Sequence, residues 1–554
     1  MNRNLRRWFT LAWFIGAVTA LPGAAPASFE DGLRRHLDKL TNDELPGMAV
    51  LVARDGKIVF QGGFGFADIA NKTPVTPETK FRIGSITKQF TAAAILRLEA
   101  EGRLALTDRL EKFFPGFARG AEVTLHQLIT HTSGLRSYTN KPEFLGRVAQ
   151  PIAPDELIAW FRDDPADFAP GAGFAYNNSG YFLLGEIVAK VAGKPFAAFL
   201  REAFFEPLGM KDTGIFVNAA PPAGEALGYA VADGQAVRAL DWDMSWAGGA
   251  GALYSTVGDL FRWNEALFSG QVVPEEALKR MTTPVKLPPG VDGMIYGYGL
   301  VISKINRLPA ISHGGALNGW SSDLTRLPEQ NCTVVAFANA RPPVAGRAPS
   351  AVVRNIVAKF LEAEIAQLPT PQQDPAVDKK TYANFLGRYS YPGAVMTVTT
   401  EDDRLFTQIT GQQRFELFAS APDAFFLKGF DAQFDFQRND QREVIAVQHS
   451  QDGNTFRAPR VVASEVKLTD AELDAILGQY QYGPTTVMTV TRDGDAVFAQ
   501  LTGQPRFSIY PKSATDYEWR VVAAKVSFVK DADGKVTKAS HTQNGRTFDA
   551  PKIK

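Results

Sequence analysis

The chain has 554 residues, of which 45% are hydrophobic and 21% charged, as is typical of a globular protein with several domains of roughly 150 residues. Lysine plus arginine and aspartate plus glutamate both number 59, and no basic run follows the first ten residues, which argues against nucleic acid as a partner. A single cysteine excludes an intrachain disulfide and a cysteine-based zinc site, and the six histidines form no metal-binding pair, so we expect no metal and no cofactor.

Residues 1–27 have the pattern of a secretory signal peptide. Three arginines within the first seven residues precede an apolar run at 8–20, and small residues at 25 and 27 fit a cleavage site. The run is shorter than the ~20 residues that a membrane-spanning helix needs. We therefore expect cleavage after Ala27, a periplasmic or secreted location and no membrane span afterwards, with the choice between general and twin-arginine export left open.

Residues 28–368 mix strand and helix patterns and are expected to form one α+β domain. Met48–Ala53 and Gly56–Gly65 predict two strands joined by a turn at Asp55 and Gly56. Thr87–Ala100 has the apolar spacing of a helix. Residues 369–378 carry three prolines and little apolar content, which indicates a linker.

Residues 379–463 and 464–554 repeat one another. Gly387-Arg-Tyr-Ser-Tyr returns as Gly478-Gln-Tyr-Gln-Tyr, and Met396-Thr-Val-Thr returns as Met488-Thr-Val-Thr, with an offset of 91 or 92 residues. Many short alternating stretches between Gly, Asp and Asn turns predict an antiparallel β-barrel in each copy. A capping box at Thr469 predicts a short helix ahead of the second barrel.

The strongest local signal in the first domain is a serine, Ser85, followed three residues later by Lys88 at the start of a helix. Residues three apart on a helix lie on one face, so the hydroxyl and the amine can meet. Burial disfavours the charged form of lysine, and a neutral lysine can take the proton of a serine nucleophile. Alone, the same pattern fits a serine that caps a helix beside a surface lysine.

Two further clusters supply partners for such a pair. Tyr176 and Asn178 lie on a glycine-rich turn before a helix, where a phenol can relay a proton and an amide can hold a substrate carbonyl. His313, Gly315 and Ala316 lie at an expected strand edge, where glycine permits close approach and a backbone N–H can bind an oxyanion. Taken alone, each cluster also fits ordinary turn chemistry.

In this order, S-x-x-K at Ser85, Y-x-N at Tyr176 and H-x-G at His313 resemble the motifs of the serine β-lactamase and penicillin-binding protein superfamily, in its class C and D-aminopeptidase branch. The resemblance covers about residues 47–361. It implies an antiparallel sheet with flanking helices, a helical subdomain beside it, and a covalent acyl-enzyme.

The resemblance also implies roles for individual residues. Ser85 would be the nucleophile, Lys88 its base and Tyr176 the proton relay. The substrate would be bound by the remaining motif residues: Asn178, His313, Gly315 and Ala316. The backbone N–H groups of Ser85 and Ala316 would form the oxyanion hole.

The histidine at 313 departs from the lysine that most β-lactamases and transpeptidases carry at this position. Lysine holds a substrate carboxylate as a permanent cation, whereas a histidine with the ordinary pKa of about 6.5 does so poorly at neutral pH. This argues against penicillin hydrolysis as the main task. The H-x-G pattern is similar to that of D-aminopeptidases.

The two tail domains strengthen the same interpretation. Two lipocalin-like β-barrels behind such a catalytic domain resemble the architecture of bacterial D-aminopeptidases, in which a barrel loop limits substrate size. The turns at 410–412 and 502–504 are candidates for this loop, and both also fit ordinary hairpins.

The sequence therefore predicts a periplasmic or secreted serine peptidase acting on short, D-residue-containing or linearised cyclic peptides. The same chemistry would serve a carboxylesterase or a weak β-lactamase. A domain that only binds cell-wall peptides is the alternative without catalysis. We expect a small peptide or ester as the substrate and leave the oligomeric state open, a homodimer included.

Overall fold

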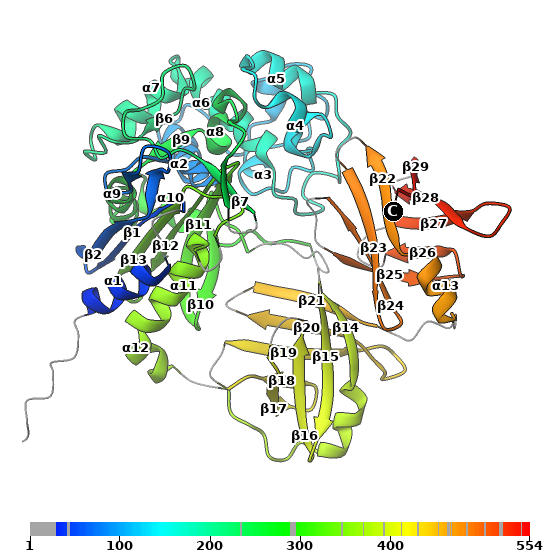
Figure 1. The fold of residues 1–554 in the computed structure, drawn as a ribbon. Helices are drawn as coiled ribbons and strands as arrows, with labels where there is room; N and C mark the ends of the chain where they lie inside the picture. Colours follow the sequence, from blue (N-terminus) through cyan, green and yellow to red (C-terminus); the bar gives the residue numbers. More distant parts are fainter. Residues whose placement is uncertain are drawn as a thin grey trace, which may run out of the picture.

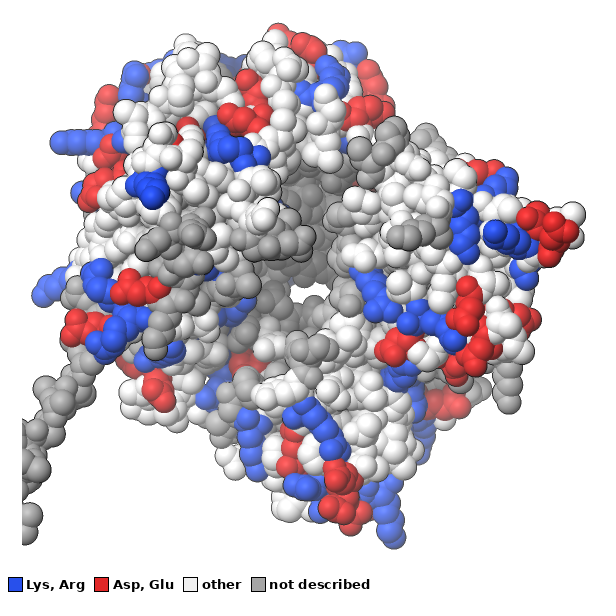
Figure 2. All heavy atoms as spheres, viewed as in Figure 1, with Lys and Arg blue, Asp and Glu red and all other residues white. Residues whose placement is uncertain are grey.

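The computed structural model describes residues 29–553, with gaps at 41–44, 233–234, 289–294, 345–346, 369–370, 392–393, 411–412, 429–430, 452–453, 462–465, 467, 484–485, 503–505, 520–523 and 544–545. The expected signal peptide lies outside these residues. Figure 1 shows a mixed helix and sheet part followed by two β-barrels, and in Figure 2 the three parts surround a central opening. Basic and acidic side chains are interspersed on this face, in line with the zero net charge. Among the described residues, no helix has both the length and the hydropathy to cross a membrane.

The first part is built on a six-stranded antiparallel sheet in the order β10-β11-β12-β13-β1-β2. The bounds of its strands are Met48–Arg54 (β1), Lys57–Phe64 (β2), Val301–Ile305 (β10), Leu308–Leu317 (β11), Trp320–Leu327 (β12) and Cys332–Ala338 (β13). The predicted hairpin at the start of the domain is thus confirmed as β1 and β2.

Both faces of the sheet are covered at β1, which explains why residues 48–53 are all apolar. Met48, Val50 and Val52 join a cluster with α1 (Phe29–Leu40) and α11 (Pro349–Phe360). Their neighbours Ala49, Leu51 and Ala53 join the other core, with α9 (Val257–Phe268) and the helical subdomain. Because side chains alternate along a strand, a sheet covered on both faces needs apolar residues at every position.

The helical subdomain packs on that second face. Its helices are α2 (Thr87–Ala100), α3 (Leu125–Ile129), α4 (Phe144–Arg147), α5 (Pro154–Phe161), α6 (Asn178–Ala192), α7 (Phe196–Leu200) and α8 (Gly248–Gly251). Other elements of the first part are α10 (Glu275–Met281), α12 (Glu362–Gln367), β3 (Phe66–Asp68), β4 (Thr73–Pro74), β5 (Phe81–Arg82), β6 (Gly214–Ile215), β7 (Tyr229–Ala232), β8 (Gln235–Arg238) and β9 (Leu253–Ser255). The bounds of α2 agree with the predicted helix.

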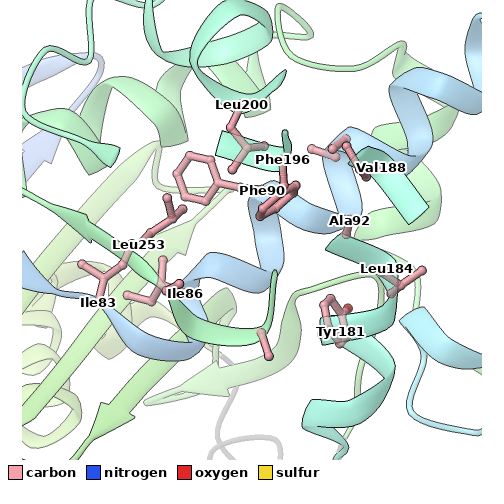
Figure 3. Close-up of a cluster of buried hydrophobic side chains, with 14 of the residues drawn as sticks. Ile83, Ile86, Phe90, Ala92, Tyr181, Leu184, Val188, Phe196, Leu200 and Leu253 are labelled. Atoms are coloured by element: carbon pink, nitrogen blue, oxygen red, sulfur yellow. The ribbon is translucent and has the colours of Figure 1, made fainter. Parts of the chain in front are cut away.

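The packing of α2 against α6 fixes the positions of the two helix N-termini. Phe90 of α2 and Tyr181, Leu184 and Val188 of α6 lie in one buried cluster (Figure 3). The N-termini of both helices therefore have fixed positions relative to the sheet, which is covered by the same core.

The sheet contributes part of β11 to the same region as these two helix N-termini. β10 pairs with β11 only as far as Ser312, so residues 313–317 pair with β12 alone among the described strands. This leaves one side of the β11 backbone facing the helical subdomain.

The repeated halves of the tail form two eight-stranded antiparallel barrels, which confirms the predicted fold class. The first is closed, because β14 pairs with β21, and the second is nearly closed, with an isolated bridge between Tyr480 and Lys552. The first comprises β14 (Gly387–Tyr391), β15 (Ala394–Glu401), β16 (Arg404–Ile409), β17 (Phe415–Ala421), β18 (Ala424–Phe426), β19 (Ala432–Arg438), β20 (Val444–Gln451) and β21 (Asn454–Val461). The second comprises β22 (Gly478–Gly483), β23 (Thr486–Asp493), β24 (Ala496–Leu501), β25 (Phe507–Pro511), β26 (Asp516–Trp519), β27 (Ala524–Lys530), β28 (Val536–Gln543) and β29 (Arg546–Pro551).

The duplication is visible in the contacts as well. The Tyr389 hydroxyl donates to the Phe385 carbonyl at 2.8 Å, and Tyr480 repeats this bond to Ile476 at 2.7 Å. The predicted helix before the second barrel is α13 (Asp470–Ala475), capped by Thr469 as expected. Most of the two candidate gate turns, residues 411–412 and 503–504, lies outside the described residues.

Candidate active site

Ser85 lies on a single 3₁₀ turn, Gly84–Ile86, that runs directly into α2. One turn later, the Nζ atom of Lys88 lies 2.9 Å from Ser85 Oγ, 2.9 Å from Asn178 Oδ1 and 2.8 Å from the Ala250 carbonyl oxygen. Lys88 is fully buried, and this burial holds its pKa well below the usual 10.5. A neutral amine has two N–H groups for the two carbonyl-type oxygens and a lone pair for the serine hydroxyl. The geometry therefore suits a lysine that accepts the proton of Ser85.

Two glycines bring β11 directly against the turn that carries Ser85. Gly84 has a φ of +52°, and a Cβ atom there would lie 2.8 Å from the Ala316 nitrogen. A Cβ atom on Gly315 would lie 1.9 Å from the Ile83 carbonyl oxygen. Only glycine permits both approaches. Ser85 and Ala316 consequently line one cavity, as an oxyanion hole formed by their backbone N–H groups requires.

Tyr176 and Asn178 reach the pair from the start of α6, where the Asn177 side chain caps the helix by accepting from the Gly180 N–H. Tyr176 is hydrogen-bonded to Ser85, and its ring centroid lies 4.8 Å from Lys88 Nζ. Burial raises the pKa of the phenol, although the bond to Ser85 opposes this effect, so Tyr176 is protonated and can donate. The Asn178 amide binds two side chains. Its oxygen accepts from Lys88, and its Nδ2 donates to Thr139 Oγ1 at 3.2 Å.

His131 holds the turn that carries Tyr176. Its carbonyl oxygen accepts from the Ala175 N–H at 3.0 Å, and its Nδ1 accepts from the Asn177 N–H at 3.0 Å. These bonds hold the residues directly before and after Tyr176, and the ring centroids of His131 and Tyr176 lie 4.4 Å apart. Burial and the nearby Lys88 hold the pKa of His131 well below its usual value, so the ring is neutral with its proton on Nε2. The sequence places His131 in a helix-to-turn segment but does not reveal this contact.

His313 is buried on β11 with both ring nitrogens occupied. Its Nδ1 lies 2.6 Å from the Gly314 carbonyl oxygen and must donate to it, so Nε2 accepts from the Tyr296 hydroxyl at 3.0 Å. Burial, with a smaller contribution from the nearby Lys88, lowers the pKa of His313 to about 3. The ring is therefore neutral and supplies no cation for a substrate carboxylate. Tyr296 was not among the residues predicted for the site.

A cavity of about 70 Å³ opens beside Ser85. Its apolar wall comprises Tyr138, Phe144, Val148, Trp242, Met244, Trp246 and Leu317. Its polar groups include Asn178, Thr139 and Asp243, and the described residues that line it include no lysine or arginine. The aromatic wall and Asp243 were not predicted, although the pattern Trp242-Asp-Met-Ser-Trp246 stands just before the glycine-rich segment at 247–251.

The chain is similar to several characterised proteins. It is 28% identical to penicillin-binding protein 4* of Bacillus subtilis (strain 168) over 404 residues, which cover 70% of this chain and 89% of that protein. It is 29% identical to a D-aminopeptidase of Gluconobacter oxydans (strain 621H) over 296 residues, which cover 53% of this chain and 56% of that protein.

Solved structures show the same relationship. The penicillin-binding protein homologue from Pyrococcus abyssi matches with a TM-score of 0.53 and 27% identity over 78% of this chain and 98% of its own. A D-stereospecific amidohydrolase from Streptomyces matches with a TM-score of 0.51 and 29% identity over 60% of this chain and 99% of its own. Residues 33–359, more than half of the chain, match the family described as Beta-lactamase, and the chain belongs to this family.

Proposed function

We propose that the chain is a serine hydrolase that forms an acyl-enzyme on Ser85 and cleaves short peptides or amides as a D-aminopeptidase does. The observation that carries this proposal is the fully buried Lys88 amine, 2.9 Å from Ser85 Oγ with two further acceptors. The D-aminopeptidase and D-stereospecific amidohydrolase among the similar proteins support the substrate class. Export directed by residues 1–27 is part of the proposal.

The reaction follows from the positions of the groups. Lys88 takes the proton of Ser85 as Oγ attacks the carbonyl carbon, and the developing oxyanion is bound by the N–H groups of Ser85 and Ala316. Tyr176 donates a proton to the leaving amine as the C–N bond breaks, and recovers a proton by way of Lys88. A water molecule then attacks the ester, and the same groups return the proton to Ser85.

The alternatives share this chemistry to different degrees. A β-lactamase or carboxypeptidase needs a cation for the substrate carboxylate, and the neutral His313 does not supply one. An esterase needs only the nucleophile and the oxyanion hole, so it remains the second candidate. A pure binding domain has no use for a proton-accepting lysine beside a serine.

The test is a panel of D-alanine and L-alanine p-nitroanilides and a p-nitrophenyl ester, given to the purified chain and to its Ser85→Ala variant. Serine-dependent cleavage of the D-anilide is expected. Cleavage of the ester alone would shift the assignment to an esterase, and anilide turnover that survives Ser85→Ala would contradict the mechanism.

A further inference from the structure

Among the described residues that line the cavity beside Ser85, Asp243 is the one with a charged side chain. One of its oxygens accepts from the Ser245 N–H at 3.0 Å and caps the short turn Met244–Trp246. Within the described part of the chain, the carboxylate has no ion pair and its second oxygen has no hydrogen-bond partner. A carboxylate oxygen without a partner on the wall of this cavity is available to a cationic group that enters it, and a charge-assisted hydrogen bond to it is stronger than a neutral one.

A neighbouring carboxylate shows that this exposure to the cavity is specific to Asp243. Asp241, two residues earlier, does not line the cavity and is bound to Arg82, with an N–O distance of 2.6 Å. Arg82 is also paired with Glu225 at 2.8 Å. The carboxylate of Asp241 is therefore neutralised by a protein cation, whereas that of Asp243 is left for a ligand.

We propose that Asp243 binds the free α-ammonium group of the substrate, while the apolar wall accepts its side chain. This inference rests on the proposed function and narrows it to substrates with an unblocked N-terminal residue. In such a substrate the ammonium nitrogen is two bonds from the scissile carbonyl carbon, so its counter-ion must share a cavity with the nucleophile. Ser85 and Asp243 meet this requirement.

The variant Asp243→Asn tests the role of the charge in substrate binding while it keeps the cap of the turn Met244–Trp246. The asparagine oxygen can still accept from the Ser245 N–H, but the negative charge is lost. Four substrates are compared: the p-nitroanilides and the benzyl esters of alanine and of N-acetylalanine, each in the stereochemistry that the wild type prefers. Asp241→Asn is the matched control. It removes the same charge two residues earlier in the chain, from a side chain that lies outside the cavity.

We expect Asp243→Asn to lower kcat/KM about 10-fold to 100-fold for the free-amine substrates and to leave the N-acetyl substrates unchanged, since a charge-assisted bond is lost only with the former. Asp241→Asn should affect neither class selectively. Equal losses on both classes, or no loss, would overturn the inference. Failure of the wild type to cleave any of the four substrates would instead refute the proposed function.

Discussion

Substituting Gly315 by alanine tests whether the contact between β11 and the nucleophile turn governs turnover. The new Cβ atom would lie 1.9 Å from the Ile83 carbonyl oxygen and 2.3 Å from Ser322 Oγ. Ordinary contact begins at 3.4 Å, so the strand and the turn must separate by about 1.5 Å. Ser322 cannot simply move aside, because its hydroxyl donates to the same Ile83 oxygen at 2.8 Å.

The separation displaces the Ala316 N–H from its position beside Ser85. Misplacement of a reacting group by about 1 Å costs on the order of 100-fold in rate. Loss of one oxyanion donor costs about 100-fold to 1,000-fold. We therefore expect Gly315→Ala to lower kcat by about 100-fold to 1,000-fold, together with a loss of about 1–3 kcal/mol in stability from overpacking.

The neighbouring glycine supplies the control. Among the described residues, a Cβ atom on Gly314 would meet the Ser322 carbonyl oxygen alone, at an ordinary 3.4 Å. Gly314→Ala should therefore retain most of the activity and stability. The assay is steady-state hydrolysis of a p-nitrophenyl ester, with urea unfolding measured in parallel. Wild-type kcat in Gly315→Ala, or equal losses in both variants, would show that the contact between β11 and the Ser85 turn does not govern turnover.

Four further outcomes are expected. Ser85→Ala should lower kcat by at least about 1,000-fold without changing the far-ultraviolet circular dichroism spectrum. The pH profile of kcat/KM should rise through the ionisation of Lys88 well below pH 10.5, because burial favours its neutral form; an acid limb centred at 10.5 would contradict this. His131→Asn keeps an acceptor for the Asn177 N–H, so its kcat should be about tenfold higher than that of His131→Leu, at similar KM. Equal kcat values would show that the bond from Asn177 to His131 does not hold Tyr176 in place. Burial raises the pKa of Asp323 to about 6 in the folded chain, compared with 3.8 in the unfolded chain. The folded chain therefore keeps this proton to higher pH, and the free energy of unfolding falls as the pH rises from 3.8 to about 6. Asp323→Asn should consequently stabilise the chain at pH 7 by on the order of 2–3 kcal/mol and give no such gain near pH 4, as urea titrations would show.

Several features could be predicted because they depend on neighbours in sequence. Ser85 and Lys88 are three residues apart, and helix geometry alone brings their side chains together. The hairpin of β1 and β2 follows from two apolar runs around Asp55 and Gly56. The two barrels follow from the internal repeat, because one set of strand and turn signals occurs twice.

Other features depend on packing between distant segments. The bond between His131 and Asn177 joins residues 46 apart and forms only once α6 is seated. The neutral state of His313 depends on its burial and on the nearby Lys88, neither of which a local motif encodes. Asp243 lies in a pattern that is typical of a capped turn, and only the structure shows that it lines the same cavity as Ser85.

Trapping the covalent intermediate would identify Ser85 as the nucleophile without relying on any substrate preference. The purified chain and its Ser85→Ala variant are mixed with p-nitrophenyl acetate, quenched in acid within the first turnovers, and analysed by intact mass and peptide mapping. An acyl-enzyme on Ser85 predicts one added acetyl group in the wild type, on the peptide that contains Ser85, and none in the variant. Turnover of the ester without any adduct on that peptide, or an adduct of equal amount in Ser85→Ala, would contradict it.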